Sequence, residues 1–305
     1  MLNIEILIAQ IVNGLSLGSI YVLLVTGFNL LLLVAMIIHF SFPVIIVFSI
    51  YMSWIVMNLT GSLALGILAA VASAILVNMV SAPIFQHIMR KRGSVDINAT
   101  MVISMGMGML ITEWTSHAIN NGFPISFETE AVDPHGWLRA TRAPFIRAGL
   151  VSISYSQVLT LLTGIILVAA LFWVLYKTKA GRAFRAIAEN PDGARLVGIP
   201  LLKTGVQSYI LTGILGGLTA ALMALLLGQA SPDLGDQLGH KVLGISIIAG
   251  LGNLGGGLVI ALLLGIVEAI VQGVFSGGSW SNTVAFLLML VIVLAKPRGV
   301  FGIKL

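Results

Sequence analysis

Two glutamates and two histidines interrupt stretches of the sequence that are apolar enough to lie in a membrane: Glu113, Glu268, His39 and His240. A charged side chain at the centre of a membrane helix costs about 3 kcal/mol by insertion scales, so its presence indicates a function. Such groups can line the path of a solute or carry a proton or ion across the membrane. The structural alternative places the glutamates near helix ends or against a partner subunit. In this alternative, each histidine is a hydrogen-bonded residue at a helix end.

Two glycine motifs resemble sites of cofactor binding or catalysis, but their surroundings argue against both. Residues 250–255 spell G-x-G-x-x-G, yet a dinucleotide site needs a preceding strand and an acidic residue about twenty positions later. Residues 14–18 fit G-x-S-x-G, but the catalytic serine of that motif lies on a strand-to-helix turn, not inside an apolar helical run. An intramembrane enzyme would need a pair such as Ser16 with a histidine, or Asp233 with Asp236, and neither pair has supporting context. We expect no catalytic residue.

The sequence contains no cysteine, and no histidines have metal-binding spacing, so we expect no metal site and no cofactor. The ATP-binding pattern G-x-x-x-x-G-K-[ST] is also absent. Energy for any transport must therefore come from a partner protein or an ion gradient.

Composition indicates an integral membrane protein. The chain is 58% hydrophobic and only 9% charged, where soluble domains have roughly 25% charged residues. The net charge of +5 is not interleaved with stacking aromatics, which gives a nucleic-acid function little support. The N-terminus has no basic region and no cleavage site, so we expect the first helix to remain in the mature protein.

Apolar runs predict an all-α, polytopic helical bundle of eight to nine transmembrane segments in one transmembrane domain, residues 1–305. The expected segments are 6–35, 44–57, 63–85, 99–119, 158–176, 206–227, a short one at 242–251, 258–274 and 284–295. Basic residues at 90–92, 177–203 and 296–298 mark the cytoplasmic side, which places the C-terminus inside and the N-terminus outside. This orientation requires the short segment 242–251 to cross the membrane.

Two interrupted helices predict a pair of inverted repeats. The first long run breaks at His39, Phe42 and Pro43, and the run 206–227 breaks at Ser231 and Asp233, each before a short helix. Interrupted helices of inverted repeats line the solute path in many transporters, so these residues, with His240 and Glu268, are candidates for that path. Gly14 and Gly18, and again Gly213 and Gly217, form G-x-x-x-G faces where helices can approach closely.

The segment 177–203 contains six of the sixteen lysines and arginines, alternating with alanine and glycine. It predicts a helix at 181–189, a turn at 190–192 and another helical piece at 193–198. Small residues between the arginines allow such a loop to lie close against another protein.

This segment resembles the cytoplasmic loop of permease subunits in bacterial ABC importers of the branched-chain amino acid type. The matching positions are Gly181, Arg182, Ala183, Arg185, Ala186, Ala188, Asn190, Pro191, Ala194, Leu196, Gly198 and Ile199. Residues 13–21 resemble the family's opening motif, residues 250–257 its G-L-G-x-x-x-G turn, and residues 296–302 its closing motif.

The resemblance implies a permease in the bacterial inner membrane, whose 177–203 loop docks on ABC ATPase subunits. It also implies a second permease subunit, expected to be a homologous but different chain, and an extracytoplasmic solute-binding protein. The polar segment 120–157 either packs over the helix ends or contacts that binding protein. The expected cargo is a small solute: a branched-chain or other amino acid, or an amide-like compound.

The sequence departs from the family at the first break. Relatives have the pattern I-N-F-A-H-G-E, and this chain has I-H-F-S-F-P-V, so His39, Phe42, Pro43 and Val44 replace the usual asparagine, histidine, glycine and glutamate. The departure bears on which solute is carried. The alternative function is an ion-coupled secondary transporter that uses Glu113 or Glu268.

Overall fold

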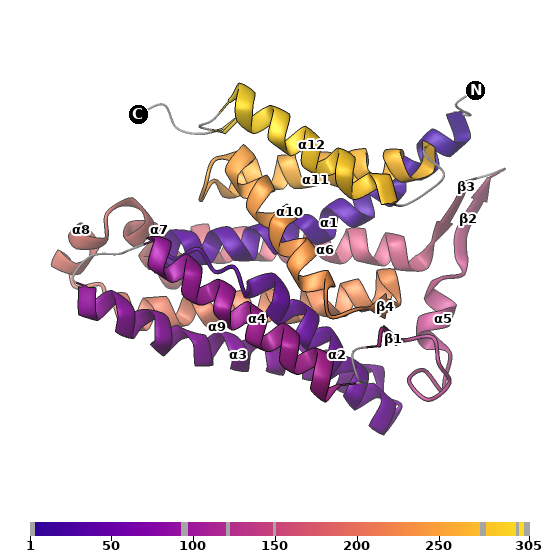
Figure 1. The fold of residues 1–305 in the computed structure, drawn as a ribbon, viewed down its shortest axis with the longest axis horizontal. Coiled ribbons are helices and arrows are strands. Elements are labelled where there is room, and N and C mark those ends of the chain that lie inside the picture. The colour runs from indigo at the N-terminus through magenta and orange to yellow at the C-terminus, as the bar shows by residue number, and fades with distance from the viewer. Residues whose placement is uncertain are drawn as a thin grey trace.

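A computed structural model describes residues 4–92, 97–119, 123–148, 151–274, 279–296 and 299–301, which form one bundle of helices (Figure 1). The helices are α1 (Ile4–Ala35), α2 (Phe42–Thr60), α3 (Leu63–Arg92), α4 (Ile97–Ala118), α5 (Trp137–Thr141), α6 (Tyr155–Lys177), α7 (Lys179–Glu189), α8 (Pro191–Leu196), α9 (Leu201–Leu227), α10 (Leu234–Ala249), α11 (Leu254–Val274) and α12 (Ser279–Ala295). The strands are β1 (Ile125–Ser126), β2 (Pro144–Ala148), β3 (Val151–Ser154) and β4 (Gln229–Ala230).

The prediction of a polytopic, all-α membrane protein is confirmed. In the described part of the chain, six helices are long and apolar enough to cross a membrane: α1, α2, α3, α6, α9 and α11. The other predicted segments correspond to α4, α10 and α12. Helix α10 has 16 residues, about 24 Å, so it is shorter than the roughly 30 Å hydrocarbon core.

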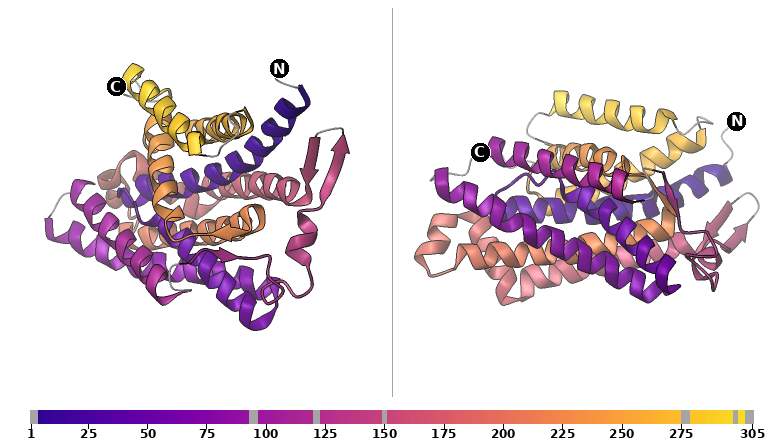
Figure 2. Two further views of the ribbon diagram at one scale, coloured as in Figure 1. Left: turned by 45° about the vertical axis from the view of Figure 1, so that its right-hand side comes forward. Right: turned by 60° about the horizontal axis from the view of Figure 1, so that its bottom comes forward.

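The chain contains two four-helix units of similar order, α1 to α4 and α9 to α12. Helices α1 and α9 run in opposite directions, and each is followed by a break and then by α2 or α10 (Figure 1). The most extensive helix contacts are those of α1 with α11 and of α9 with α3. Each unit therefore packs its first helix against the third helix of the other, as expected for inverted repeats, and the views in Figure 2 show this interlocking.

Glycines allow these two helix pairs to approach closely, as the G-x-x-x-G faces predict. A Cβ atom at Gly14 would lie 2.5 Å from the Cα of Ile266 in α11, and one at Gly217 would lie 2.3 Å from the Cα of Val71 in α3. Both distances are far below van der Waals contact, and both are to backbone atoms that cannot rotate away. The helix spacing is thus fixed by the missing side chains.

The polar segment between α4 and α6 has secondary structure of its own. Strand β1 pairs antiparallel with β4, which follows α9, and β2 pairs with β3 in a hairpin. The carboxylate of Asp133 accepts hydrogen bonds from the backbone N–H groups of Trp137 (2.7 Å) and Arg139 (3.0 Å), which caps α5. The Arg142 guanidinium pairs with Glu128, and its partial burial lowers the pKa of that guanidinium.

Several expected boundaries differ in the structure. The short helix predicted at 242–251 begins at Leu234, so α10 starts directly after the break at Ser231 and Asp233. The turn expected at 190–192 is shorter, because α8 begins at Pro191. The basic residues 90–92 are the last residues of α3, because the helix continues beyond its apolar part. Arg298, part of the basic C-terminal motif, lies outside the described residues.

Candidate functional site

The first break ends α1 at Ala35, where Met36 adopts a left-handed backbone conformation (φ 56°). His39 in this break is fully buried. Its Nε2 lies 3.2 Å from Ser81 Oγ in α3, and its Nδ1 lies 3.1 Å from Ser41 Oγ. The Ser81 hydroxyl donates to the Asn78 carbonyl at 2.6 Å, so it accepts from Nε2–H of His39, and Nδ1 accepts from Ser41. His39 thus attaches the broken segment to α3.

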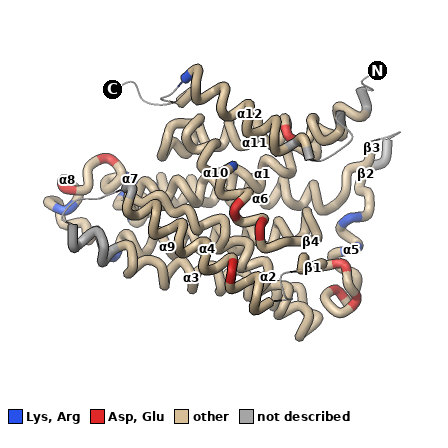
Figure 3. The backbone as a smooth tube through the Cα atoms, viewed as in Figure 1, with Lys and Arg blue, Asp and Glu red and all other residues tan. Residues whose placement is uncertain are grey.

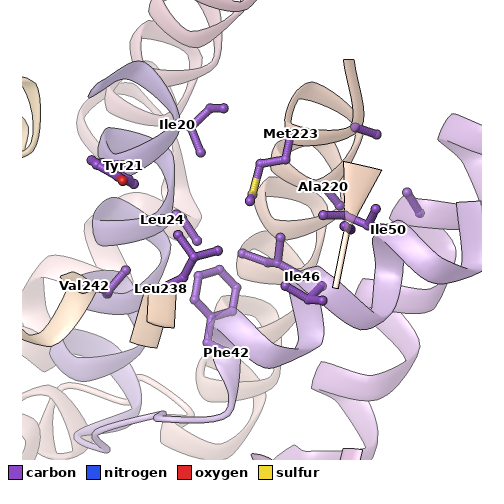
Figure 4. Close-up of a cluster of buried hydrophobic side chains, with 14 of the residues drawn as sticks. Ile20, Tyr21, Leu24, Phe42, Ile46, Ile50, Ala220, Met223, Leu238 and Val242 are labelled. Atoms are coloured by element: carbon purple, nitrogen blue, oxygen red, sulfur yellow. The ribbon is translucent and has the colours of Figure 1, made fainter. Parts of the chain in front are cut away.

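Phe42 and Pro43, the other predicted path residues of this break, are also buried. The Phe42 ring points into the apolar cluster between α1, α9 and α10 (Figure 4). It fills the space left by two glycines, since a Cβ atom at Gly27 would lie 2.7 Å from the ring and one at Gly216 would lie 3.1 Å from it. In this conformation the first break is enclosed by the chain's own helices.

The second break exposes its polar side chains. Asp233, Asp236 and His240 of the break and of α10 are exposed, while Ser231 is half-buried. The His240 ring stands edge-on to Phe40 of the first break, with ring centroids 6.2 Å apart. The exposed face of α10 therefore lies beside the first break, and it carries the predicted path residues that are accessible.

Glu268 is buried, and it belongs to a group of three side chains from three helices. Its Oε1 accepts from Lys241 Nζ of α10 at 2.6 Å, and its Oε2 accepts from the Tyr21 hydroxyl of α1 at 2.7 Å. Lys241 Nζ also donates to the Tyr21 hydroxyl oxygen at 2.9 Å. The exposed fractions are 3% for Tyr21, 5% for Lys241 and 4% for Glu268, so Glu268 faces a partner within the chain and not the surface.

Sequence reasoning missed Lys241 and Tyr21. A usable signal exists for Lys241, because it is the one lysine or arginine between Lys203 and Lys296. A lone positive charge in an apolar stretch calls for a buried partner of opposite charge, and Glu268 is the one acidic residue of the following span. Tyr21 carries no comparable signal.

Glu113, the second intramembrane glutamate, lies on an exposed face of α4. Its carboxylate is 3.5 Å from Nδ1 of His117 one turn later, near the C-terminal end of the helix. This position fits the structural alternative of a helix-end residue. No group of three or more potential metal ligands occurs within the described ranges.

The predicted docking loop forms two consecutive helices, α7 and α8, at one end of the bundle, where charged residues gather (Figure 3). Gly181 is buried at the corner between α6 and α7, and a Cβ atom there would lie 2.2 Å from the Val174 carbonyl oxygen. Asn190 caps α8 by accepting from the N–H of Gly193 at 2.9 Å, and Pro191 follows in the first turn. These residues set the shape of the loop.

Buried apolar residues of α7 and α8 also support the shape of the loop. Phe184 and Ile187 are buried with Ala194, while Ala183 and Ala186 are half-buried. The backbone of Gly198 is left-handed (φ 84°), which ends α8 and turns the chain toward α9.

The outer surface of the loop combines charge with exposed apolar side chains. Arg182, Arg185 and Arg195 are exposed. Leu196 and Val197 at the tip are 89% and 76% exposed, among the most exposed large apolar residues described. Sequence reasoning used Leu196 only as a match to the family.

A cavity of about 1020 Å³ separates α7 from the turn between α10 and α11. Its lining includes Phe184 and Arg185 of α7, residues 250–255 of the turn, and Phe301. Arg185 lies over the Tyr176 ring, 4.8 Å from its centroid. The docking loop and the end of α10 therefore face each other across open space.

Comparison with known proteins finds relatives over nearly the whole chain. BraD, the high-affinity branched-chain amino acid transport system permease protein of Pseudomonas aeruginosa, is 26% identical over 96% of this chain and 95% of its own. LivH, the corresponding permease protein of Salmonella typhimurium, is 24% identical over 96% and 94%. The autoinducer 2 import system permease protein LsrC of Escherichia coli is 28% identical over 44% and 41%.

No solved structure matches the chain. The family described as branched-chain amino acid transport system / permease component matches residues 10–293. A match of this length, together with the helical bundle and its two interrupted repeats, shows that the chain belongs to this family of ABC-type permeases.

Proposed function

We propose that the chain is the transmembrane permease subunit of a bacterial ABC importer for a branched-chain or other amino acid, or an amide-like compound. An extracytoplasmic binding protein delivers the solute, ABC ATPase subunits drive its passage, and a second permease chain completes the path. Residues 1–305 form one transmembrane permease domain. The amino-acid cargo is supported by the names of BraD and LivH, which are branched-chain amino acid permeases. The relative LsrC is named for the import of a different solute, autoinducer 2.

The observation that carries the proposal is the tip of the α7–α8 loop. Leu196 and Val197 expose apolar surface directly after the exposed Arg195, on a scaffold fixed by Gly181 at its corner. Exposed apolar residues rimmed by charge mark protein interaction sites. The ATPase subunits fit this surface, since the chain has no ATP-binding motif of its own.

The arrangement of the termini supports the proposed orientation in the inner membrane. The end of α12 lies at the same end of the bundle as α7 and α8, and the start of α1 lies at the opposite end (Figure 1). An ATPase on the loop therefore implies a cytoplasmic C-terminus and an N-terminus outside. The described residues of the segment 120–157 lie at the end of the bundle opposite α7 and α8 (Figure 1), and this segment is the proposed contact for the binding protein.

The exposed face of α10 with Asp233 and His240 is the proposed contribution of this chain to the solute path. The ion-coupled alternative has less support, because Glu268 is already paired with Lys241 and Glu113 lies at the exposed end of α4.

The docking proposal is tested by Leu196→Glu and Val197→Glu in an importer assembled with its ATPase subunits. Both variants should insert normally but lose co-purification with the ATPase and lose ATP hydrolysis stimulated by the loaded binding protein. Leu59→Glu is the matched control, because Leu59 is 80% exposed at the C-terminal end of α2, far from the loop. Retained co-purification in both loop variants refutes the docking assignment.

A further inference from the structure

The pair of Lys241 and Glu268 differs from the other ion pairs of the described residues, because both of its side chains are buried. Taking two charges out of water costs more than their attraction usually returns, so a buried ion pair adds little to stability. Apolar side chains of similar size are often as stable or more stable in such a place. A role in placing α10 accounts for the pair better than a role in holding the fold.

Lys241 makes a directional contact on a buried face of α10 that is otherwise mostly aliphatic. Gly235 brings the start of this face close to α2, since a Cβ atom there would lie 2.9 Å from the Val44 Cα. Apart from glycines, Lys241 and Ser246, the buried residues of α10 are aliphatic, and contacts between aliphatic surfaces are not directional. The Ser246 hydroxyl has no hydrogen-bond partner among the described residues, so Lys241 supplies the directional side-chain contact of this face.

Lys241 directly follows His240 in the sequence, and the two side chains have opposite environments. His240 is exposed, while Lys241 reaches Tyr21 of α1 and Glu268 of α11. Successive residues of a helix are about 100° apart, so a rotation of α10 by one position that carries His240 into the buried place of Lys241 would carry Val242 into the half-buried place of Leu243. The same rotation would withdraw His240 from the accessible face.

We propose that Lys241, Glu268 and Tyr21 are positioning residues, which fix the rotation of α10 about its own axis and so keep His240 on the accessible face of this helix. The proposal rests on the proposed function in taking this face as the solute path. The rotation itself is measurable without knowing the cargo.

The test introduces single cysteines into the full-length protein in membranes. Because the chain contains no cysteine, only the introduced residue can be labelled. A water-soluble maleimide should label His240→Cys and spare Val242→Cys, since Val242 is fully buried. In Lys241→Met or Glu268→Gln, labelling of the cysteine at 242 should become at least about fivefold faster, because labelling follows the population in which the site is open. Ile45→Cys in α2, also fully buried, should stay protected and so exclude general unfolding.

Double variants separate positioning from charge neutralisation. Lys241→Met with Glu268→Met removes both charges, and the cysteine at 242 should still be labelled quickly, whereas the exchanged pair Lys241→Glu with Glu268→Lys should restore protection. Tyr21→Phe, which keeps the ion pair and loses the two hydroxyl contacts, should give a smaller increase in the same direction. Wild-type labelling in the double methionine variant overturns the proposal. If that variant does not insert, wild-type labelling in both Tyr21→Phe and Glu268→Gln overturns it.

Discussion

The replacement of Gly181 by alanine adds one methyl group and should weaken the binding of the ATPase to the permease. The added Cβ would lie 2.2 Å from the Val174 carbonyl oxygen and 2.3 Å from that of Leu175, where ordinary contacts begin near 3.4 Å. Both neighbours are backbone atoms of α6, so α7 must move by about 1 Å to accept the methyl group. Inserting one carbon into such a site typically costs about 1–3 kcal/mol.

This displacement acts on the tip of the loop. Helix α7 has 11 residues, about 16 Å, and any tilt at its first turn is enlarged over that length. If the ATPase binds the native position of the tip, returning α7 to it costs the same 1–3 kcal/mol. The apparent affinity of the permease for the ATPase should then fall by about 5- to 150-fold.

The assay titrates purified ATPase subunits against detergent-solubilised permease and measures binding and stimulated ATP hydrolysis. Gly106→Ala in α4 is the control, because a Cβ there would meet no atom within 4 Å. Native affinity in Gly181→Ala, or an equal loss in both variants, refutes the argument that the α6–α7 corner positions the loop.

Two further substitutions test the packing of the bundle. Gly217→Ala places a methyl group against the backbone of Val71 and should lower the unfolding midpoint in detergent, by about 2–4 °C for each kcal/mol lost. Gly106→Ala, where nothing lies within 4 Å, is its control and should leave the midpoint nearly unchanged; an equal drop would contradict the close approach of α9 and α3. His39→Phe removes both ring hydrogen bonds at the first break and leaves Ser81 without its buried donor, which typically costs about 1–3 kcal/mol. The same unfolding scan measures it, and an unchanged midpoint would show that His39 does not hold the break to α3.

Much of this protein follows from its sequence because a membrane leaves few choices. Backbone groups in a bilayer must bond within their own segment, so long apolar runs become helices, and basic residues set their orientation. The α7–α8 loop and the G-x-x-x-G faces could also be predicted, because each depends on residues that are neighbours along the chain.

The tertiary structure decided which side chains meet. The two breaks look equivalent in sequence, yet the first is enclosed by Ser81 and the apolar cluster while the second is exposed. Glu268 appeared as a lone intramembrane charge until α10 brought Lys241 to it across 27 positions. Local patterns can show that a charge in a membrane needs a partner, but only the packing of three helices determines which residue that partner is.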